Sequence, residues 1–374
     1  MFELRASQAW RWMHCTAYRL MAKGGYVPDI EDTTVRDEGL AFHWAALMVW
    51  LGHRVDVGQR VQCDGMSASV EVDDAMIDAI DEYLDRIKSR GGMPMLEYTV
   101  AASRIHASCG GTTDAWNWVA PLRTLYVDDA KYGYRWVDPF RNPQCLIYVS
   151  GLLDHIGVVD DREVTVVISI FQPRAYRRGG PWFEWRVNAA QLRAYFNELS
   201  NAADEAMSPN AKCRTGEWCN SCGARPTCDA FNEAKENALD VSRAPVDNDL
   251  TPERVDVELQ RVERALDILD AHKMAMQARA EMFIRSGKQL RNYEMQPGRS
   301  ALRWKDGMEP ALEAMERTQA ITLFKRRPIT PTQAKKLLPE PTVDALSDRM
   351  PGKLKLVRVD GDRAARLFGT TDES

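Results

Sequence analysis

The sequence lacks an apolar run long enough to cross a membrane, and its first residues do not form the basic-then-apolar pattern of a signal peptide. These absences predict a cytoplasmic protein without membrane contact. The chain also lacks an excess of basic charge, because 54 acidic residues outnumber 49 basic ones and give a net charge of −5. A protein that coats nucleic acid by bulk attraction is therefore disfavoured. A nuclease is not excluded, since divalent cations and a local basic groove can hold phosphates on an acidic protein.

The pattern of apolar residues predicts a mixed α/β fold with a separate C-terminal part. A change in composition after Cys228 divides the chain into residues 1–239 and residues 240–374, the latter expected to hold a helical arm and a basic extension. The core is expected to run helix, three strands, helix, strand. The helices are expected at 7–22, 37–52, 72–90, 142–156, 188–206 and 251–286, and the strands at 96–106, 113–119, 123–131, 163–171 and 353–359.

Two carboxylates and a lysine follow one another at the ends of two predicted strands. Asp114 begins one strand, and Asp129 and Lys131 end the next. Because side chains alternate along a strand, Asp129 and Lys131 share a face, and the Ala130 carbonyl between them stays free to coordinate. Oxygen ligands of this kind hold Mg²⁺ or Mn²⁺, and a neighbouring lysine offsets charge that develops on a phosphate. The segment therefore predicts metal-assisted phosphodiester hydrolysis, although a solvated strand-end ion pair is the plain alternative.

Four further residues extend this interpretation. His43 lies in an upstream helix and is a suitable additional metal ligand. Gln144 and Tyr148 are one turn apart on the helix that follows, where an amide and a phenol can contact a DNA backbone. Arg174, close to Arg177 and Arg178, follows the fourth strand and is a candidate DNA-binding residue, and a second basic cluster lies at 325–327.

In this order the residues resemble the RecB-like exonuclease branch of the PD-(D/E)XK nuclease superfamily, including phage-encoded members, over roughly residues 5–232. The resemblance implies a restriction-endonuclease-like core. It implies that His43, Asp114 and Asp129 bind the metal and that Lys131 is the catalytic lysine. Gln144 and Tyr148 match the Gln-x-x-x-Tyr motif of that branch. The proline of the superfamily name is replaced by Thr113, as is frequent in the branch.

Half of the eight cysteines lie within sixteen residues, at Cys213, Cys219, Cys222 and Cys228. In a reducing compartment this density predicts metal ligation rather than disulfides. These four thiols satisfy a structural Zn²⁺ by themselves. The resemblance implies instead a [4Fe–4S] cluster held by Cys15, Cys219, Cys222 and Cys228, with Cys213 as an alternative fourth ligand. We favour the cluster, and we expect Cys63, Cys109 and Cys145 to be ordinary thiols.

Together these features predict a Mg²⁺- or Mn²⁺-dependent exonuclease acting at DNA ends in phage replication or recombination. A structure-specific endonuclease and a catalytically inactive DNA-binding module of the same fold are the alternatives. The expected partner is DNA, with a single-strand annealing or single-strand binding protein as a further candidate. The helical arm at 251–286 can join two copies of the chain or pack on the core, and packing on the core is the preferred interpretation.

Overall fold

The computed structural model describes residues 2–24, 33–158, 161–175, 180–243, 249–297, 301–305, 307–319, 321, 323, 331–335, 337–350 and 354–358. The chain forms two compact units, Met1–Ala275 and Met276–Ser374. The division falls within the long helix α8 (Pro252–Arg285). The sequence-based boundary at 239/240 falls within α7 (Asp229–Arg243) and stays a prediction. The basic clusters at 177–178 and 325–327 lie outside the described residues.

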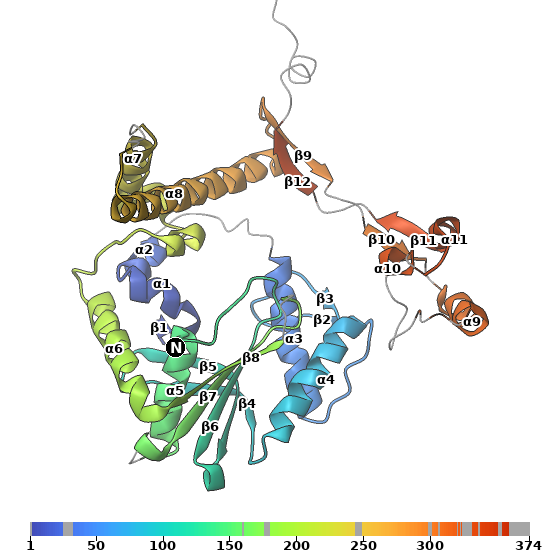
Figure 1. The fold of residues 1–374 in the computed structure, drawn as a ribbon, viewed down its shortest axis with the longest axis horizontal. Helices are drawn as coiled ribbons and strands as arrows, with labels where there is room; N and C mark the ends of the chain where they lie inside the picture. The colour runs from blue at the N-terminus through green and yellow to red at the C-terminus, as the bar shows by residue number, and fades with distance from the viewer. Residues whose placement is uncertain are drawn as a thin grey trace, which may run out of the picture. The chain divides into compact units, whose positions relative to one another are not determined.

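The first unit is built on a six-stranded mixed sheet (Figure 1). Its long strand β5 pairs antiparallel with β4 and β6 and parallel with β1. β6 and β7 are parallel, and β7 and β8 are antiparallel. The expected α/β class is confirmed, with three strands, a helix and a further strand in the predicted order. The strands are β1 (Leu4–Arg5), β4 (Met95–Ala101), β5 (Cys109–Val119), β6 (Thr124–Ala130), β7 (Thr165–Phe171) and β8 (Trp182–Asn188).

Helices cover both faces of this sheet (Figure 1). α1, α5 and α6 pack on one face, in a core that includes Trp12, Ile147 and Leu199. α3 and α4 pack on the other face, where Phe42 and Tyr83 contact the sheet residue Phe171. The helices are α1 (Ala9–His14), α2 (Tyr18–Gly24), α3 (Thr34–Trp50), α4 (Asp74–Ser89), α5 (Pro143–His155), α6 (Arg193–Met207), α7 and the first part of α8, and a small hairpin joins β2 (Arg60–Val61) to β3 (Val70–Glu71).

The best-predicted helices are those with strong capping residues. The Asp73 side chain accepts a hydrogen bond from Met76 N at 2.8 Å and begins α4. Asn142 accepts one from Cys145 N at 3.2 Å, and Pro143 occupies the first turn of α5. Both caps satisfy backbone donors that the first helical turn leaves unpaired. The predicted helices at 72–90 and 142–156 are therefore confirmed to within two residues.

Three details of the prediction are wrong. The helix expected at 7–22 is broken at Cys15, whose backbone is extended (φ −118°, ψ 93°), so α1 and α2 are separate. The strand expected at 96–106 ends at Ala101, because Ala102 takes part in a turn in which Ile105 N donates to its carbonyl. Finally, β1 and β8 were not predicted, although both extend the sheet.

The second unit contains two antiparallel strand pairs and a small apolar core. β9 (Tyr293–Pro297) pairs with β12 (Leu354–Arg358), which lies within the predicted strand at 353–359, and β10 (Ala301–Trp304) pairs with β11 (Ser347–Met350). α9 (Glu309–Gln319), α10 (Pro331–Ala334) and α11 (Glu340–Leu346) accompany them. None of the helices that the structure describes combines the length and the apolar character needed to span a membrane.

Candidate active site and cysteine centre

Strands β4, β5 and β6 bring acidic side chains to one place in the sheet. Leu96 pairs with Ala115 and Tyr98 with Thr113, so the register sets Glu97 opposite Asp114. β6 carries Asp129 next to β5, and Lys131 follows directly, its backbone N donating to Phe171 O at 2.8 Å. The predicted meeting of Asp114, Asp129 and Lys131 therefore follows from the antiparallel pairing of β5 with β6, and β4 adds Glu97.

His43, Glu97 and Asp114 form a set of potential metal ligands. His43 Nδ1 lies 3.4 Å from Glu97 Oε1 and 3.7 Å from Asp114 Oδ1. One ligand atom from each residue lies within 4.8 Å of the others. Since Mg²⁺–oxygen distances are about 2.1 Å, ligands on opposite sides of the ion lie roughly 4.2 Å apart. The spacing and the donor types, two carboxylates and an imidazole, therefore fit one hard divalent cation.

Glu97 is the site residue that the sequence interpretation missed. Its backbone is left-handed, with φ at +49°, in the middle of β4. For a residue other than glycine this conformation costs on the order of 1–3 kcal/mol, and such strain gathers at functional sites. A single glutamate within a predicted strand is weak evidence for a metal ligand. Its pairing opposite Asp114 is a long-range property that no local pattern reveals.

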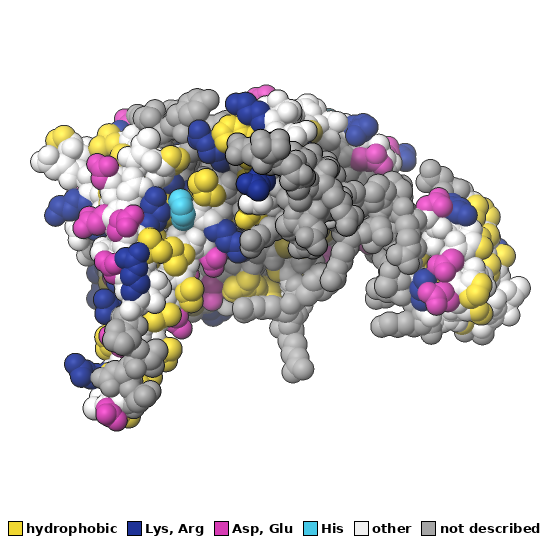
Figure 2. Space-filling model, turned by 90° about the horizontal axis from the view of Figure 1, so that it is seen from above, with side chains coloured by type: hydrophobic (Ala, Val, Ile, Leu, Met, Phe, Trp, Pro, Cys, Tyr) yellow, Lys and Arg dark blue, Asp and Glu magenta, His cyan; other side chains and the backbone are white. Residues whose placement is uncertain are grey.

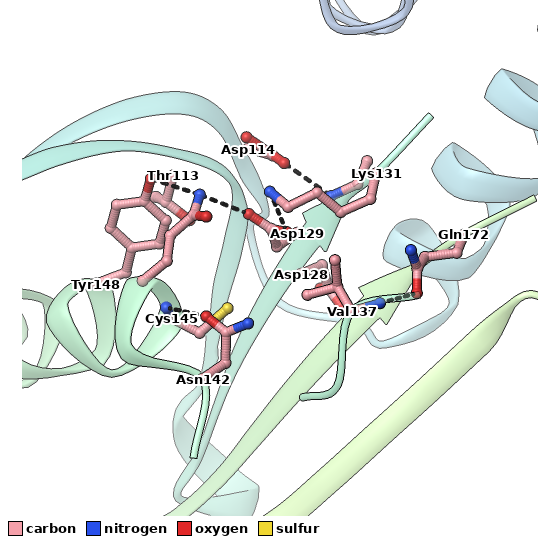
Figure 3. A network of polar contacts seen from close by, with 12 residues as sticks. Thr113, Asp114, Asp128, Asp129, Lys131, Val137, Asn142, Cys145, Tyr148 and Gln172 are labelled. Carbon is pink, nitrogen blue, oxygen red and sulfur yellow. Dashed lines mark hydrogen bonds and ion pairs between the residues drawn. The ribbon is translucent and has the colours of Figure 1, made fainter. Parts of the chain in front are cut away.

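Asp129 lies outside this set and belongs to a neighbouring network (Figure 3). Its carboxylate is fully buried, with Lys131 Nζ at 2.6 Å and Gln144 Nε2 donating at 3.0 Å. Gln144 Nε2 also donates to Tyr148 Oη at 3.2 Å. Ala130 N donates to Asp114 Oδ2 at 2.7 Å, which joins the network to the ligand set. Direct coordination by Asp129 or by the Ala130 carbonyl stays a prediction.

The motif residues Gln144 and Tyr148 make contacts within the protein. Tyr148 is 2% exposed, and a Cβ on Gly111 would lie 3.1 Å from its ring. Glycine at this position therefore leaves room for the ring beside β5. The phenol holds Gln144, and Gln144 holds Asp129, so both residues fix the orientation of a carboxylate. Their predicted contact with DNA is not tested by this geometry.

The carboxylates of the site create a negative potential that favours a bound cation. Burial alone would lower the pKa of His43, but the Asp114 and Glu97 carboxylates raise it to about 9. Burial raises the pKa of Asp129 to about 6 even though Lys131 opposes the shift. Burial would lower the pKa of Lys131, and the carboxylates of Asp129 and Asp114 raise it. Lys131 is thus a fixed cation at neutral pH, and three carboxylates surround it and His43.

His43, Glu97 and Asp114 line a cleft of about 730 Å³, and the buried Asp129 is not part of its lining. Lys131, Gln144 and Tyr148 share it with the ligand set, and Phe2, Arg5 and Ser7 from the N-terminal segment form part of its wall. On the surface face shown in Figure 2, the described Lys and Arg side chains lie among Asp and Glu side chains rather than in one basic stripe.

Arg174 lies apart from the cleft lining. Its guanidinium pairs with Glu38 at 2.5 Å and lies over the rings of Tyr132 and Tyr134, 4.7 and 4.2 Å from their centroids. Arg174 also donates to the Tyr132 carbonyl at 3.2 Å. These contacts hold the segment after Lys131, and the predicted DNA-binding role of Arg174 remains untested.

Five cysteines meet in a second place in the first unit. Cys15, from the break between α1 and α2, lines a small, partly open cavity together with Cys213, Cys219, Cys222 and Cys228. All are free thiols. Burial raises the pKa of Cys213 to about 12 and of Cys219 to about 11, and the neighbouring thiols add to both shifts. The predicted gathering of Cys15 with the C-terminal cysteines is thus present, with Cys213 also within the group.

Hydrogen bonds hold the two cysteine-bearing segments together. Thr16 Oγ1 accepts from Lys212 N at 3.1 Å and donates to Glu205 Oε1 at 2.9 Å. Ala17 N donates to Lys212 O at 3.1 Å. Cys63, Cys109 and Cys145 do not line the cavity, and Cys109 and Cys145 are buried in the core beside the sheet. The break at Cys15 therefore has a structural consequence, since it turns this thiol towards residues 213–228.

A family model described as "Protein of unknown function (DUF2800)" matches residues 3–364. The chain belongs to this DUF2800 family. None of the curated proteins matches it. The family description names no activity, so the function of this DUF2800 protein has to be argued from its site.

Proposed function

We propose that this DUF2800 protein is a Mg²⁺- or Mn²⁺-dependent deoxyribonuclease, acting as an exonuclease at DNA ends. The observation that supports this most directly is the set His43, Glu97 and Asp114 beside Lys131 in one cleft. The choice of DNA, of ends and of phage replication or recombination comes from the resemblance to the RecB-like branch.

The donor set and its charge suit a hard divalent cation. His43, Glu97 and Asp114 would hold it, and the raised pKa of His43 reflects an excess of negative charge that such a cation offsets. When bound, the ion supplies Lewis acidity towards the phosphate and lowers the pKa of water. Glu97 is thereby added to His43 and Asp114, the metal ligands that the sequence predicted.

The other residues have separate tasks. Lys131 stays protonated, so it serves as a fixed cation for charge that develops on the phosphate and not as a base. Asp129 holds the Lys131 ammonium at 2.6 Å, and Gln144 fixes Asp129. Tyr148 in turn accepts from Gln144. This chain of contacts presets the position of the charge before the substrate enters.

For the cysteine cavity we propose a [4Fe–4S] cluster held by Cys15, Cys219, Cys222 and Cys228. The meeting of these thiols in one cavity suits a metal centre, and structural Zn²⁺ is the alternative. Such a centre would join α1 and α2 to residues 213–228 without entering the cleft. Brown protein with visible absorption supports iron–sulfur, while colourless protein with bound zinc supports the alternative.

The test compares wild type with Lys131→Ala on end-labelled linear DNA and on circular DNA, with Mg²⁺ or Mn²⁺. We expect Lys131→Ala to lower the cleavage rate by roughly 10²–10³-fold, the usual effect of removing one preorganised charge-stabilising group. Lys88→Ala, an exposed lysine of α4, is the matched control and should cleave like wild type.

The outcomes separate the alternatives. Cleavage of linear DNA alone supports an exonuclease, and equal cleavage of circles indicates an endonuclease. Equal activity of wild type and Lys131→Ala rejects the site. DNA binding without any cleavage in either metal leaves the inactive DNA-binding module as the function.

A further inference from the structure

Helix α8 has a second apolar face that its own unit does not cover. Val255, Leu259, Val262 and Leu266 are 40%, 56%, 42% and 55% exposed. We call these four residues the α8 stripe. Their spacings of four, three and four residues are those of the a and d positions of a heptad, so they lie along one line on the helix.

A different face of α8 makes the core contacts. Ala265, Ile268 and Ala271 are buried, and they pack with Phe231 and Ala238 of α7 and with Cys219. Ile268 and Ala271 lie on the far side of the helix from the α8 stripe, and Ala265 lies on its flank, given 3.6 residues per turn. The stripe is therefore not needed for folding of this unit, and exposed apolar lines of this kind mark binding surfaces.

One edge of the stripe is strongly acidic. Asp256, Glu263, Asp267 and Asp270 are exposed and follow the stripe along one flank. In the part of the chain that the structure describes, Glu263, Asp267 and Asp270 have no ion-pair partner, and Asp256 accepts only from Gln260 at 2.9 Å. We call these four residues the acidic row. On the other flank Glu258 pairs with Arg261 at 3.7 Å.

The charge of the acidic row indicates which kind of helix can bind beside the α8 stripe. In an antiparallel pair of α8 helices, the row of one copy would face the row of the other. In a parallel pair, it would face Thr251, Glu258 and Ala265, none of which is basic. A second copy therefore supplies no fixed cation to the row, and like charges across a helix pair are destabilising.

We propose that the α8 stripe and the acidic row together dock an amphipathic helix of another protein, with an apolar seam flanked by Lys and Arg. The seam would cover the stripe in the manner of a helix pair, and the basic flank would pair with the acidic row. This docking surface lies on a different side of α8 from the face that packs with Cys219. It does not depend on the nuclease proposal.

The test uses two synthetic helical peptides with the same leucine seam, one flanked by lysines and the other by glutamates. Their binding to the full-length protein is measured by fluorescence anisotropy at low and at high salt. We expect the lysine peptide to bind about tenfold more tightly at low salt, and this preference to shrink as salt screens the charges.

Three variants complete the experiment. The double variant Leu259→Gln/Leu266→Gln should weaken both peptides, and the triple variant Glu263→Lys/Asp267→Lys/Asp270→Lys should reverse the preference. Met93→Gln, at an 87% exposed apolar residue elsewhere, is the control and should bind like wild type. Circular dichroism checks that all variants are folded.

Three results would overturn the proposal. The first is equal binding, or no binding, of both peptides to wild type. The second is a preference that the triple variant leaves unchanged. The third is a dimer in sedimentation that Leu259→Gln/Leu266→Gln dissolves, because the occupant would then be a second copy.

Discussion

The cleft and the cysteine cavity use opposite chemistry within one unit. The cleft offers oxygen and nitrogen ligands, and the side chains of His43 and Glu97 keep 26% and 29% of their surface exposed. The cavity offers sulfur ligands enclosed by aromatic residues such as Trp218 and Phe231. Hard, exchangeable cations suit the first site, and soft, retained metals suit the second. Ligand type and access therefore favour chemistry for the proposed metal in the cleft and a structural role for the proposed metal in the cysteine cavity.

The strongest test of this division is Asp114→Asn. It removes one ligand charge from the cleft, so we expect cleavage to fall by about 10³-fold, since metal catalysis contributes several kcal/mol. The metal content of the cysteine cavity should not change. End-labelled DNA assays and elemental analysis measure the two effects. Asp204→Asn, an exposed residue of α6, is the control, and a loss of cysteine-bound metal in Asp114→Asn would break the division.

The converse change is Cys219→Ser. Loss of a retained metal should lower the free energy of unfolding by about 4 kcal/mol if the metal is present at 1,000 times its dissociation constant. Thermal unfolding and metal analysis measure this change. Cys63→Ser, outside the cavity, is the matched control. In wild type, ethylenediaminetetraacetate should stop cleavage by removing the cleft metal while the cavity metal stays bound. Unchanged stability and metal content in Cys219→Ser would contradict a cysteine centre.

The pH dependence of Mn²⁺ binding gives a smaller effect. Because the pKa of His43 is raised to about 9, the metal has to displace a proton at lower pH. The apparent affinity should therefore rise about tenfold per pH unit, or about 100-fold from pH 6.5 to 8.5, and level off above pH 9. Calorimetric titration measures this slope. His43→Asn should bind more weakly and lose the slope, and a flat profile in wild type would exclude His43 as a ligand.

The smallest effect is expected for Tyr148→Phe. This variant removes one acceptor of Gln144 and keeps the ring beside Gly111. A neutral hydrogen bond contributes about 1 kcal/mol, so the cleavage rate should fall roughly three- to tenfold. Single-turnover kinetics measure the change. A loss as large as that of Lys131→Ala would instead mean that the phenol takes part in the chemistry.

The sequence predicted the parts of the site that local patterns determine. Asp129, Ala130 and Lys131 are neighbours at one strand end, and Gln144 and Tyr148 are one helical turn apart, so their relative positions follow from the period of each element. Capping by Asn142 and Pro143 likewise determined where α5 begins. These features depend on a few residues along the chain.

The parts that escaped prediction depend on long-range pairing. Glu97 becomes a site residue because β4 pairs with β5 in one register, and its left-handed backbone leaves no trace in residue type. The break at Cys15 contains neither proline nor glycine, and its reason lies in hydrogen bonds from Cys15 and Thr16 to the Lys212 carbonyl, 197 and 196 positions later in the chain. The strand β8 was missed although its apolar and polar residues alternate from Phe183 to Asn188, and its place at the end of the sheet depends on its pairing with β7.

Trp218 gives the cysteine cavity an optical reporter. Its indole lines the cavity and stacks on His14, with ring centroids 4.7 Å apart. An absorbing iron–sulfur centre held by the cysteines of this cavity would quench the emission of the indole, whereas a closed-shell zinc ion would leave it bright. The difference in emission between wild type and Trp218→Phe is the emission of Trp218. It would therefore indicate whether the cysteines bind an iron–sulfur cluster or zinc, in the folded protein and while the metal is being added.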